Sequence, residues 1–109
     1  MTTSSRAFRR HSILLPRRFN DGSAVPYEII GDTLIELRQR FGAVSSETQT
    51  IQGSWTHEET IYLDELIRVW VDVDDTDANR AFFADFKDRL KARFQQLDIW
   101  MTTYLVEVI

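Results

Sequence analysis

The chain has 109 residues, of which 43% are hydrophobic, a size that fits one ordinary domain with a buried core. It contains no cysteine, which excludes a disulfide framework, a thiolate metal site and a cysteine nucleophile and agrees with a cytoplasmic protein. Residues 1–18 carry a charge of +5 and the remainder −9, so the net charge is −4. An acidic body argues against nucleic acid as a partner. No apolar run is long enough to span a membrane.

The first residues, 1–7 ("MTTSSRA"), are small and polar, and we expect them to form a disordered tail ahead of a single domain over residues 8–109. Residues 8–19 read as a first strand centred on Ile13, Leu14 and Leu15. Pro16 places the later half of this strand at an edge or an end, because proline cannot donate to a sheet ladder. The sequence "NDGS" then predicts a turn.

A first helix is predicted over residues 26–41. Pro26 suits the first helical position, where a missing N–H costs nothing. Apolar residues follow at spacings of four, three and four, which places them on one face: Ile30, Leu34, Leu37 and Phe41. Gly42 is expected to end the helix as a left-handed C-cap.

Two strands follow. Residues 43–55 ("AVSSETQTIQGSW") are polar and alternating, and predict a second strand with at most one buried face. Residues 56–60 are expected to form a hairpin loop. Residues 61–73 are the clearest strand of the chain, because one alternate set is apolar apart from Glu65 and should face the core: Leu63, Ile67, Val69, Val71 and Val73.

A second helix and a last strand complete the chain. Thr76 is a good N-cap, and Asp77 complements the positive end of the helix dipole. The helix should extend to about Gln96, with its apolar stripe formed by Phe82, Phe83, Phe86, Leu90, Phe94 and Leu97. Residues 98–109, rich in β-branched and aromatic side chains, predict the final strand.

The resulting order, β-α-β-β-α-β, is that of the α+β ferredoxin-like plan, in which a four-stranded antiparallel sheet packs two helices on one face. Right-handed crossovers place both helices on the same side. The other side of the sheet is left open, so the sequence must be examined for what its exposed residues could contact.

The open face is expected to be aromatic. The third strand would place Tyr62, Arg68 and Trp70 there, and the last strand Trp100 and Tyr104, if the alternate residues of that strand point to the helices. Such a surface is too aromatic to remain wet on a small monomer. Our first hypothesis is therefore a non-enzymatic, homo-oligomeric binding module that pairs with a second copy, as a homodimer, through this face.

The alternative is a small enzyme with a pocket near Trp55, His57, Asp64 and Arg68. Arg68 would hold an anionic group of a small molecule, and His57 or Asp64 would move a proton. A third possibility, single-stranded nucleic acid stacked on the aromatics, lacks the basic and aromatic motif of such domains and meets acidic residues on the face. The sequence alone does not decide whether the protein is an enzyme.

The sequence offers no recognisable metal or cofactor site, and we expect neither. "HEET" at residues 57–60 lacks the second histidine of the zinc motif H-E-x-x-H. The acidic run at residues 72–77 lacks the glycine and terminal glutamate of a calcium loop, and helix capping accounts for most of it. Phosphate-loop, dinucleotide and serine-hydrolase motifs are also missing.

Three segments, "ILLPRRFNDGSAVP", "LRQRFGAVSSETQTIQGSW" and "FKDRLKARFQQLDIWMTTY", resemble those of short, uncharacterised bacterial proteins of about this length. This resemblance implies a compact stand-alone protein and carries over no activity and no functional residue. In architecture the chain is also similar to dimeric α+β barrel proteins, some of which are small monooxygenases or haem-degrading enzymes. A haem-degrading member would need an axial ligand, for which His11 and His57 are the only histidines.

Overall fold

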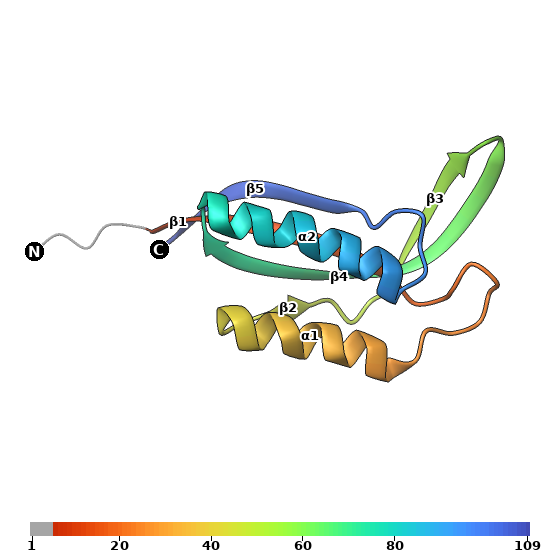
Figure 1. Cartoon of the computed structure of the whole chain (residues 1–109), viewed down its shortest axis with the longest axis horizontal. Coiled ribbons are helices and arrows are strands. Elements are labelled where there is room, and N and C mark those ends of the chain that lie inside the picture. The colour runs from red at the N-terminus through yellow and green to blue at the C-terminus, as the bar shows by residue number, and fades with distance from the viewer. Residues whose placement is uncertain (1–5) are drawn as a thin grey trace, which may run out of the picture.

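The computed structural model describes residues 6–109 (Figure 1). The first five residues of the expected tail lie outside this range, whereas Arg6 and Ala7 belong to the first strand. The elements, in chain order, are β1 (Arg6–Pro16), α1 (Tyr27–Phe41), β2 (Ser45–Ser46), β3 (Ile51–His57), β4 (Thr60–Asp74), α2 (Asp77–Arg93) and β5 (Met101–Val108).

The sheet is antiparallel throughout, in the order β2-β4-β1-β5, and β3 also pairs with β4. This is the expected ferredoxin-like order with one difference: the sheet has five strands, not four. The predicted second strand is interrupted. β2 pairs with β4 at Trp70 and Val69, and β3 pairs with it from Leu66 to Thr60. Both short strands therefore share one long partner.

The physical reason for the interruption lies at residues 47–50. The Glu47 amide still donates to the Arg68 carbonyl and so continues the pairing of β2 with β4, whereas the Thr50 hydroxyl accepts a hydrogen bond from Arg17 Nη1 at 2.8 Å. The Arg17 amide in turn donates to the Glu65 carbonyl. The chain is thus held near the loop that follows β1 before it returns to the ladder at Ile51.

The core lies between the two helices and one face of the sheet. Val69, Val71 and Val73 of β4 are buried, as their alternation predicts, together with Ile13 and Leu15 of β1. Both helices contribute to the same cluster, through Ile30 and Leu37 from α1 and Phe83, Phe86 and Leu90 from α2. Both helices therefore cover one side of the sheet, and the other side remains open.

The hairpin of β3 with the first half of β4, residues 51–66, projects beyond the helices, and we call it the arm (Figure 1). Its turn is shorter than the predicted loop of residues 56–60, because Glu58 and Glu59 both take positive φ angles, 49° and 67°. Such two-residue turns match the twist of paired strands. Leu63 was expected to face the core. It is instead 81% exposed, because no helix extends over the arm.

The helix ends follow local signals. The Thr76 side chain accepts a hydrogen bond from the Asn79 amide at 3.1 Å, and Gly42 takes the left-handed C-cap conformation with a φ of 87°. Pro26 is the N-cap residue of α1, so the helix begins at Tyr27, one position after the predicted start. α2 ends at Arg93, earlier than expected, so Leu97 lies outside the apolar stripe and is 51% exposed. Neither helix in residues 6–109 combines the length and hydropathy needed to cross a bilayer.

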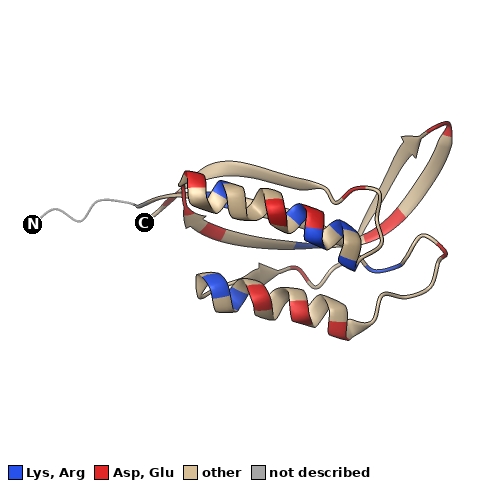
Figure 2. Ribbon diagram, in the orientation of Figure 1, with Lys and Arg blue, Asp and Glu red and all other residues tan. Residues whose placement is uncertain are grey.

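Charged residues of both signs follow one another along the two helices (Figure 2). Glu36 of α1 accepts hydrogen bonds from Arg89 at 2.6 Å and from Arg93 at 2.8 Å, both on α2. These two hydrogen bonds hold the pKa of the Glu36 carboxyl below its usual value against the opposing effect of burial, the largest single influence on it. The bonds tie the two helices together above the core.

A buried histidine lies inside the helix-covered face of the sheet. His11 of β1 is 2% exposed, and its ring stacks on Phe83 with centroids 3.9 Å apart. Burial, and next the nearby Arg9 charge, lower the pKa of His11 to about 4. Within residues 6–109, its buried Nδ1 has no hydrogen-bond partner. The folded state therefore holds this imidazole neutral.

We expect His11→Phe to weaken the dependence of stability on pH. Unfolded His11 binds a proton below its ordinary pKa of 6.5, whereas the folded chain binds it only near 4. The wild type therefore loses stability as the pH falls from 6.5 to 4, by on the order of 2 kcal/mol from this group. Phenylalanine keeps the ring stack and cannot titrate.

The measurement is urea unfolding of both proteins at pH 7.5 and pH 4.5. Carboxylates that titrate in this range affect both proteins alike, so the difference between the two pH slopes isolates His11. Equal slopes for the wild type and His11→Phe would show that the folded state does not hold the imidazole neutral.

Candidate functional site

The open face of the sheet carries the alternate residues of β1, β4 and β5 that point away from the helices. A hollow of about 340 Å³ lies on it. Its lining combines aromatic, charged and hydroxyl side chains from the three strands, from residue 47 and from residue 100 just before β5: Arg10, Ser12, Leu14, Glu47, Arg68, Trp70, Trp100, Thr102 and Tyr104. The volume lies within the range of small-molecule sites. We call this the sheet hollow.

Arg10 lies at the centre of the polar contacts in the sheet hollow. Its guanidinium forms two parallel bonds to Asp72, at 2.8 and 3.0 Å, and Nη1 donates to the Tyr104 hydroxyl at 3.4 Å. The same group lies 5.6 Å from the centre of the Trp70 ring and 5.9 Å from that of Tyr104. The bond to Asp72 raises the pKa of Arg10, so this cation is permanent. Arg10 therefore holds the rings of Trp70 and Tyr104 together on one wall of the sheet hollow.

Glu47 and Arg68 form another wall of the sheet hollow. Arg68 Nη1 lies 3.4 Å from Glu47 Oε1, and the two side chains are 46% and 37% exposed. A single contact of this length leaves donors on the guanidinium and a second oxygen on the carboxylate. Both groups can therefore meet a ligand without first losing a tight bidentate pair.

A second hollow, of about 400 Å³, lies where the arm joins the body, and we call it the arm-base hollow. It shares Leu14 and Trp100 with the sheet hollow and is otherwise lined mainly by residues of the arm and of the segment before β5. Here Trp55 Nε1 donates to Asp64 Oδ2 at 2.6 Å, and the Trp55 ring stacks on Tyr62 at 4.5 Å. Trp100 is thus the wall between two neighbouring hollows.

The residues proposed for an interface fall into two groups. Arg68, Trp70, Trp100 and Tyr104 all line the sheet hollow. Tyr62 lies on the arm against Trp55, away from the other four. The period-two assignment of the last strand is therefore the one the structure has, with Trp100 and Tyr104 on the open side and Met101 packed against the core.

The residues proposed for catalysis are not brought into one place. Arg68 lines the sheet hollow and Asp64 the arm-base hollow with Trp55. His57 lies at the end of the arm, where its side chain is 47% exposed and its Nε2 is 3.7 Å from Glu58. The predicted pocket around Trp55, His57 and Arg68 is thus replaced by two hollows that His57 does not line.

The sequence reading missed Arg10 and Glu47. Arg10 had a signal, because Ile13 and Leu15 are apolar and Arg10 belongs to the other alternate set of β1. Glu47 had no such signal in the sequence. It follows the two-residue strand β2, in a segment that the sequence predicts to be one longer strand.

The site offers stacking surfaces, hydroxyl groups and one loosely paired carboxylate. Within residues 6–109, no group of three or more His, Asp or Glu side chains has the arrangement of a metal site. Each of the two charge pairs at the sheet hollow, Arg10 with Asp72 and Arg68 with Glu47, combines one positive and one negative charge. The hollow therefore suits a ligand with a flat aromatic part and several hydroxyl or amino groups.

No protein-family model matches the chain, and no curated protein matches it by sequence. Two solved structures share its fold. A phage SAM lyase in complex with S-methyl-5'-thioadenosine superposes with a TM-score of 0.69 at 11% identity, covering 99% of this chain and 94% of the other. A phage SAM lyase in the apo state gives a TM-score of 0.58 at 12% identity, covering 99% and 92%. The chain therefore shares the small α+β fold of these two structures.

Proposed function

We propose that this protein is a small enzyme that binds an adenosine-containing thioether or sulfonium compound in the sheet hollow. The observation that carries the proposal is the hollow itself, which Trp70, Trp100 and Tyr104 line together with charged and hydroxyl side chains. The structural neighbour is in complex with a molecule of this class, S-methyl-5'-thioadenosine. That likeness is at the level of fold, so the residues of the hollow support the ligand class separately.

Each part of such a ligand has a matching group. A purine ring stacks on indole and phenol rings, at about 1–3 kcal/mol per base. The carboxylate of Glu47 can accept hydrogen bonds from ribose hydroxyls, as acidic side chains do in nucleotide sites. Ser12 and Thr102 supply further donors from neighbouring strands. The aromatic walls also favour a sulfonium cation, because the faces of aromatic rings attract positive charge.

The test has two parts. S-Methyl-5'-thioadenosine is titrated into the protein by calorimetry, with tryptophan fluorescence as a second signal because two of the three indoles line the sheet hollow. S-Adenosylmethionine is then incubated with the protein, and the release of S-methyl-5'-thioadenosine is followed by chromatography. We expect saturable binding and product above the uncatalysed rate. An absence of binding by both compounds at millimolar concentration would contradict the proposal.

A second candidate function is self-association through the same face, and one observation favours it. Trp100 is 65% exposed and Tyr104 50%, on a face that no helix covers. Large aromatic side chains gathered on one exposed surface are typical of contact sites. A second copy would bury them and would also close the open side of the sheet hollow.

We expect Trp70→Arg to convert an oligomer into a monomer of 12.8 kDa. The substitution removes an indole from the contact and places a second guanidinium beside that of Arg10, so the contact surface would carry two adjacent positive charges. The measurement is light scattering at micromolar concentration. Leu105→Arg is the matched control, since Leu105 is 61% exposed on β5 but belongs to the alternate set that does not line the sheet hollow. A wild-type protein that is already monomeric would exclude self-association as the function.

A further inference from the structure

A third hollow, unrelated to the open face, lies on the helix side of the sheet between α2, β1 and β5. Its volume is about 200 Å³. The buried rings of His11 and Phe83 line it together with Met101, and its remaining lining is mostly cationic or polar: Arg9, Arg80, Ala84, Lys87 and Thr103. We call it the cationic hollow. Neither of the two proposals above uses it.

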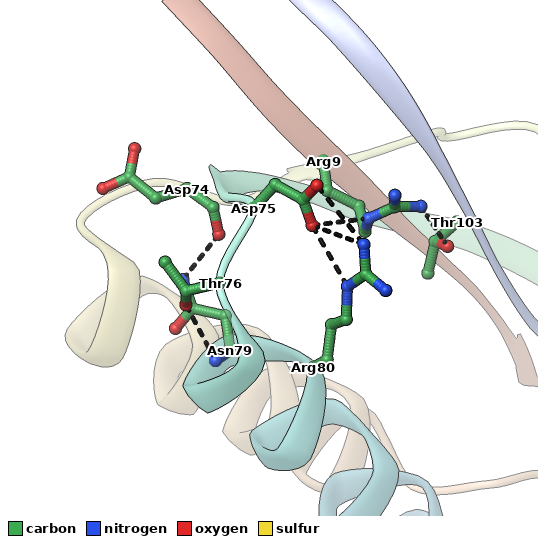
Figure 3. A network of polar contacts seen from close by, with 7 residues as sticks. All are labelled: Arg9, Asp74, Asp75, Thr76, Asn79, Arg80 and Thr103. Carbon is green, nitrogen blue, oxygen red and sulfur yellow. Dashed lines mark hydrogen bonds and ion pairs between the residues drawn. The ribbon is translucent and has the colours of Figure 1, made fainter.

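Two guanidinium groups in the cationic hollow share a single carboxylate (Figure 3). Asp75 Oδ1 accepts from Arg9 Nε at 2.8 Å and from Arg80 Nη2 at 3.0 Å. Arg9 Nη1 donates to the Thr103 hydroxyl at 2.9 Å, which fixes its orientation. The Asp74 carboxylate points away from this pair (Figure 3). One positive charge of the two arginines is therefore left without a matching carboxylate.

The third cation, Lys87, does not add to this excess. Lys87 Nζ lies 3.1 Å from Asp98 Oδ1, so this pair is neutral overall. Three cations thus face two carboxylates. Within residues 6–109, Arg9 Nη2 and Arg80 Nη1 have no hydrogen-bond partner among the side chains and carbonyls. Guanidinium forks with free donors, held side by side, have the geometry that favours a tetrahedral oxyanion.

The lining also contains a polar group that is buried and incompletely bonded. His11 is 2% exposed and lines the cationic hollow, and its Nδ1 has no partner within the described residues. Arg9 and Arg80 repel a proton on His11, whereas Asp75 attracts one. An anion placed between the two arginines would oppose their effect on the imidazole. The arginine pair thus leaves a positive charge unmatched in the cationic hollow, and the histidine leaves a buried polar atom without a partner in the same hollow.

We propose that the cationic hollow binds a phosphate group, held by Arg9 and Arg80 with Lys87 at its edge. The phosphate would accept hydrogen bonds from the free donors of the two guanidinium groups. It would also balance the one positive charge of Arg9 and Arg80 that Asp75 does not neutralise. Because this hollow lies on the other side of the sheet from Trp100, the site is separate from the proposed substrate site.

The experiment compares sodium phosphate with sodium chloride at equal ionic strength, using thermal unfolding and the NMR titration of His11. We expect phosphate to raise the unfolding temperature and to raise the pKa of His11. Arg80→Gln should weaken phosphate binding about tenfold, because it removes one charge-assisted donor group. Arg80 is 53% exposed, so the variant should fold.

Arg89→Gln is the matched control, because Arg89 also lies on α2 and also contacts two carboxylates, Glu36 and Asp85, but lies outside the cationic hollow. It should keep the full response to phosphate. Methyl phosphate, tested in parallel, separates the two sources of the group: tighter binding than phosphate indicates an organic phosphate ester, and weaker binding the free ion. An equal response of the wild type and Arg80→Gln would overturn the proposal, as would a His11 pKa that phosphate leaves unchanged.

Discussion

Phe86→Ala is expected to lower the free energy of unfolding by about 3–5 kcal/mol, the largest effect of any single substitution considered. Phe86 is fully buried near the middle of α2. Its ring stacks on Phe82 at 5.4 Å and meets the edge of Phe83 at 6.3 Å. Removing it leaves a cavity at the contact between the helices and the sheet. The cavity cannot collapse easily, because both neighbours are held by contacts of their own.

The same ring supports the polar layer above it. The guanidinium of Arg89 lies 4.9 Å from the centre of the Phe86 ring, and that of Arg93 lies 5.9 Å from it. Both arginines also bond Glu36 of α1. The loss of Phe86 therefore removes a support for the contact between the helices as well as apolar contacts.

Urea unfolding followed by circular dichroism measures the effect. Tyr27→Ala is the control, because Tyr27 is an aromatic residue of α1 that is 79% exposed, and its removal should change stability by less than about 0.5 kcal/mol. Similar losses for Phe86→Ala and Tyr27→Ala would show that the phenylalanine cluster of α2 does not form the core.

The sequence was sufficient for elements whose signals are local. The alternation around Val69, Val71 and Val73 set the faces of β4, since successive side chains of a strand point to opposite sides. Thr76 and Gly42 marked a helix start and a helix end through their own backbone and side-chain chemistry. From these elements the order of the fold followed.

The sequence was insufficient where a distant partner decides the outcome. Residues 43–55 alternate as one strand would, but the contact of Thr50 with Arg17, outside the sheet ladder, separates β2 from β3. Leu63 has the pattern of a core residue and is exposed, because the pattern does not tell where the covering helices end. Glu58 and Glu59 form a tight turn without the glycine or asparagine that usually signals one.

The same distinction applies to the candidate site. Trp70, Trp100 and Tyr104 were predicted to share a face because each belongs to a long alternating strand. Arg68 shares that face with them, but His57 does not, since a hairpin of two long strands carries it away from the body. Proximity along the sequence had suggested a pocket that the geometry of the arm excludes.

Trp100→Ala is expected to weaken the binding of S-methyl-5'-thioadenosine ten- to a hundredfold, following the proposed function. The indole is 65% exposed and forms the wall between the sheet hollow and the arm-base hollow. Stacking of one base on one aromatic ring contributes about 1–3 kcal/mol, which corresponds to that range of affinities. Because Trp100 is exposed, its loss should leave stability nearly unchanged.

Leu105→Ala separates stacking on the open face from general loss of apolar surface. Leu105 is 61% exposed, belongs to β5 and does not line the sheet hollow. Calorimetric titration of the three proteins should give the wild-type affinity for Leu105→Ala and a much weaker one for Trp100→Ala. Equal weakening in both variants would mean that the ligand does not use the open face. Unchanged binding in Trp100→Ala would place any ligand elsewhere, because an aromatic ring bound in either hollow meets this indole.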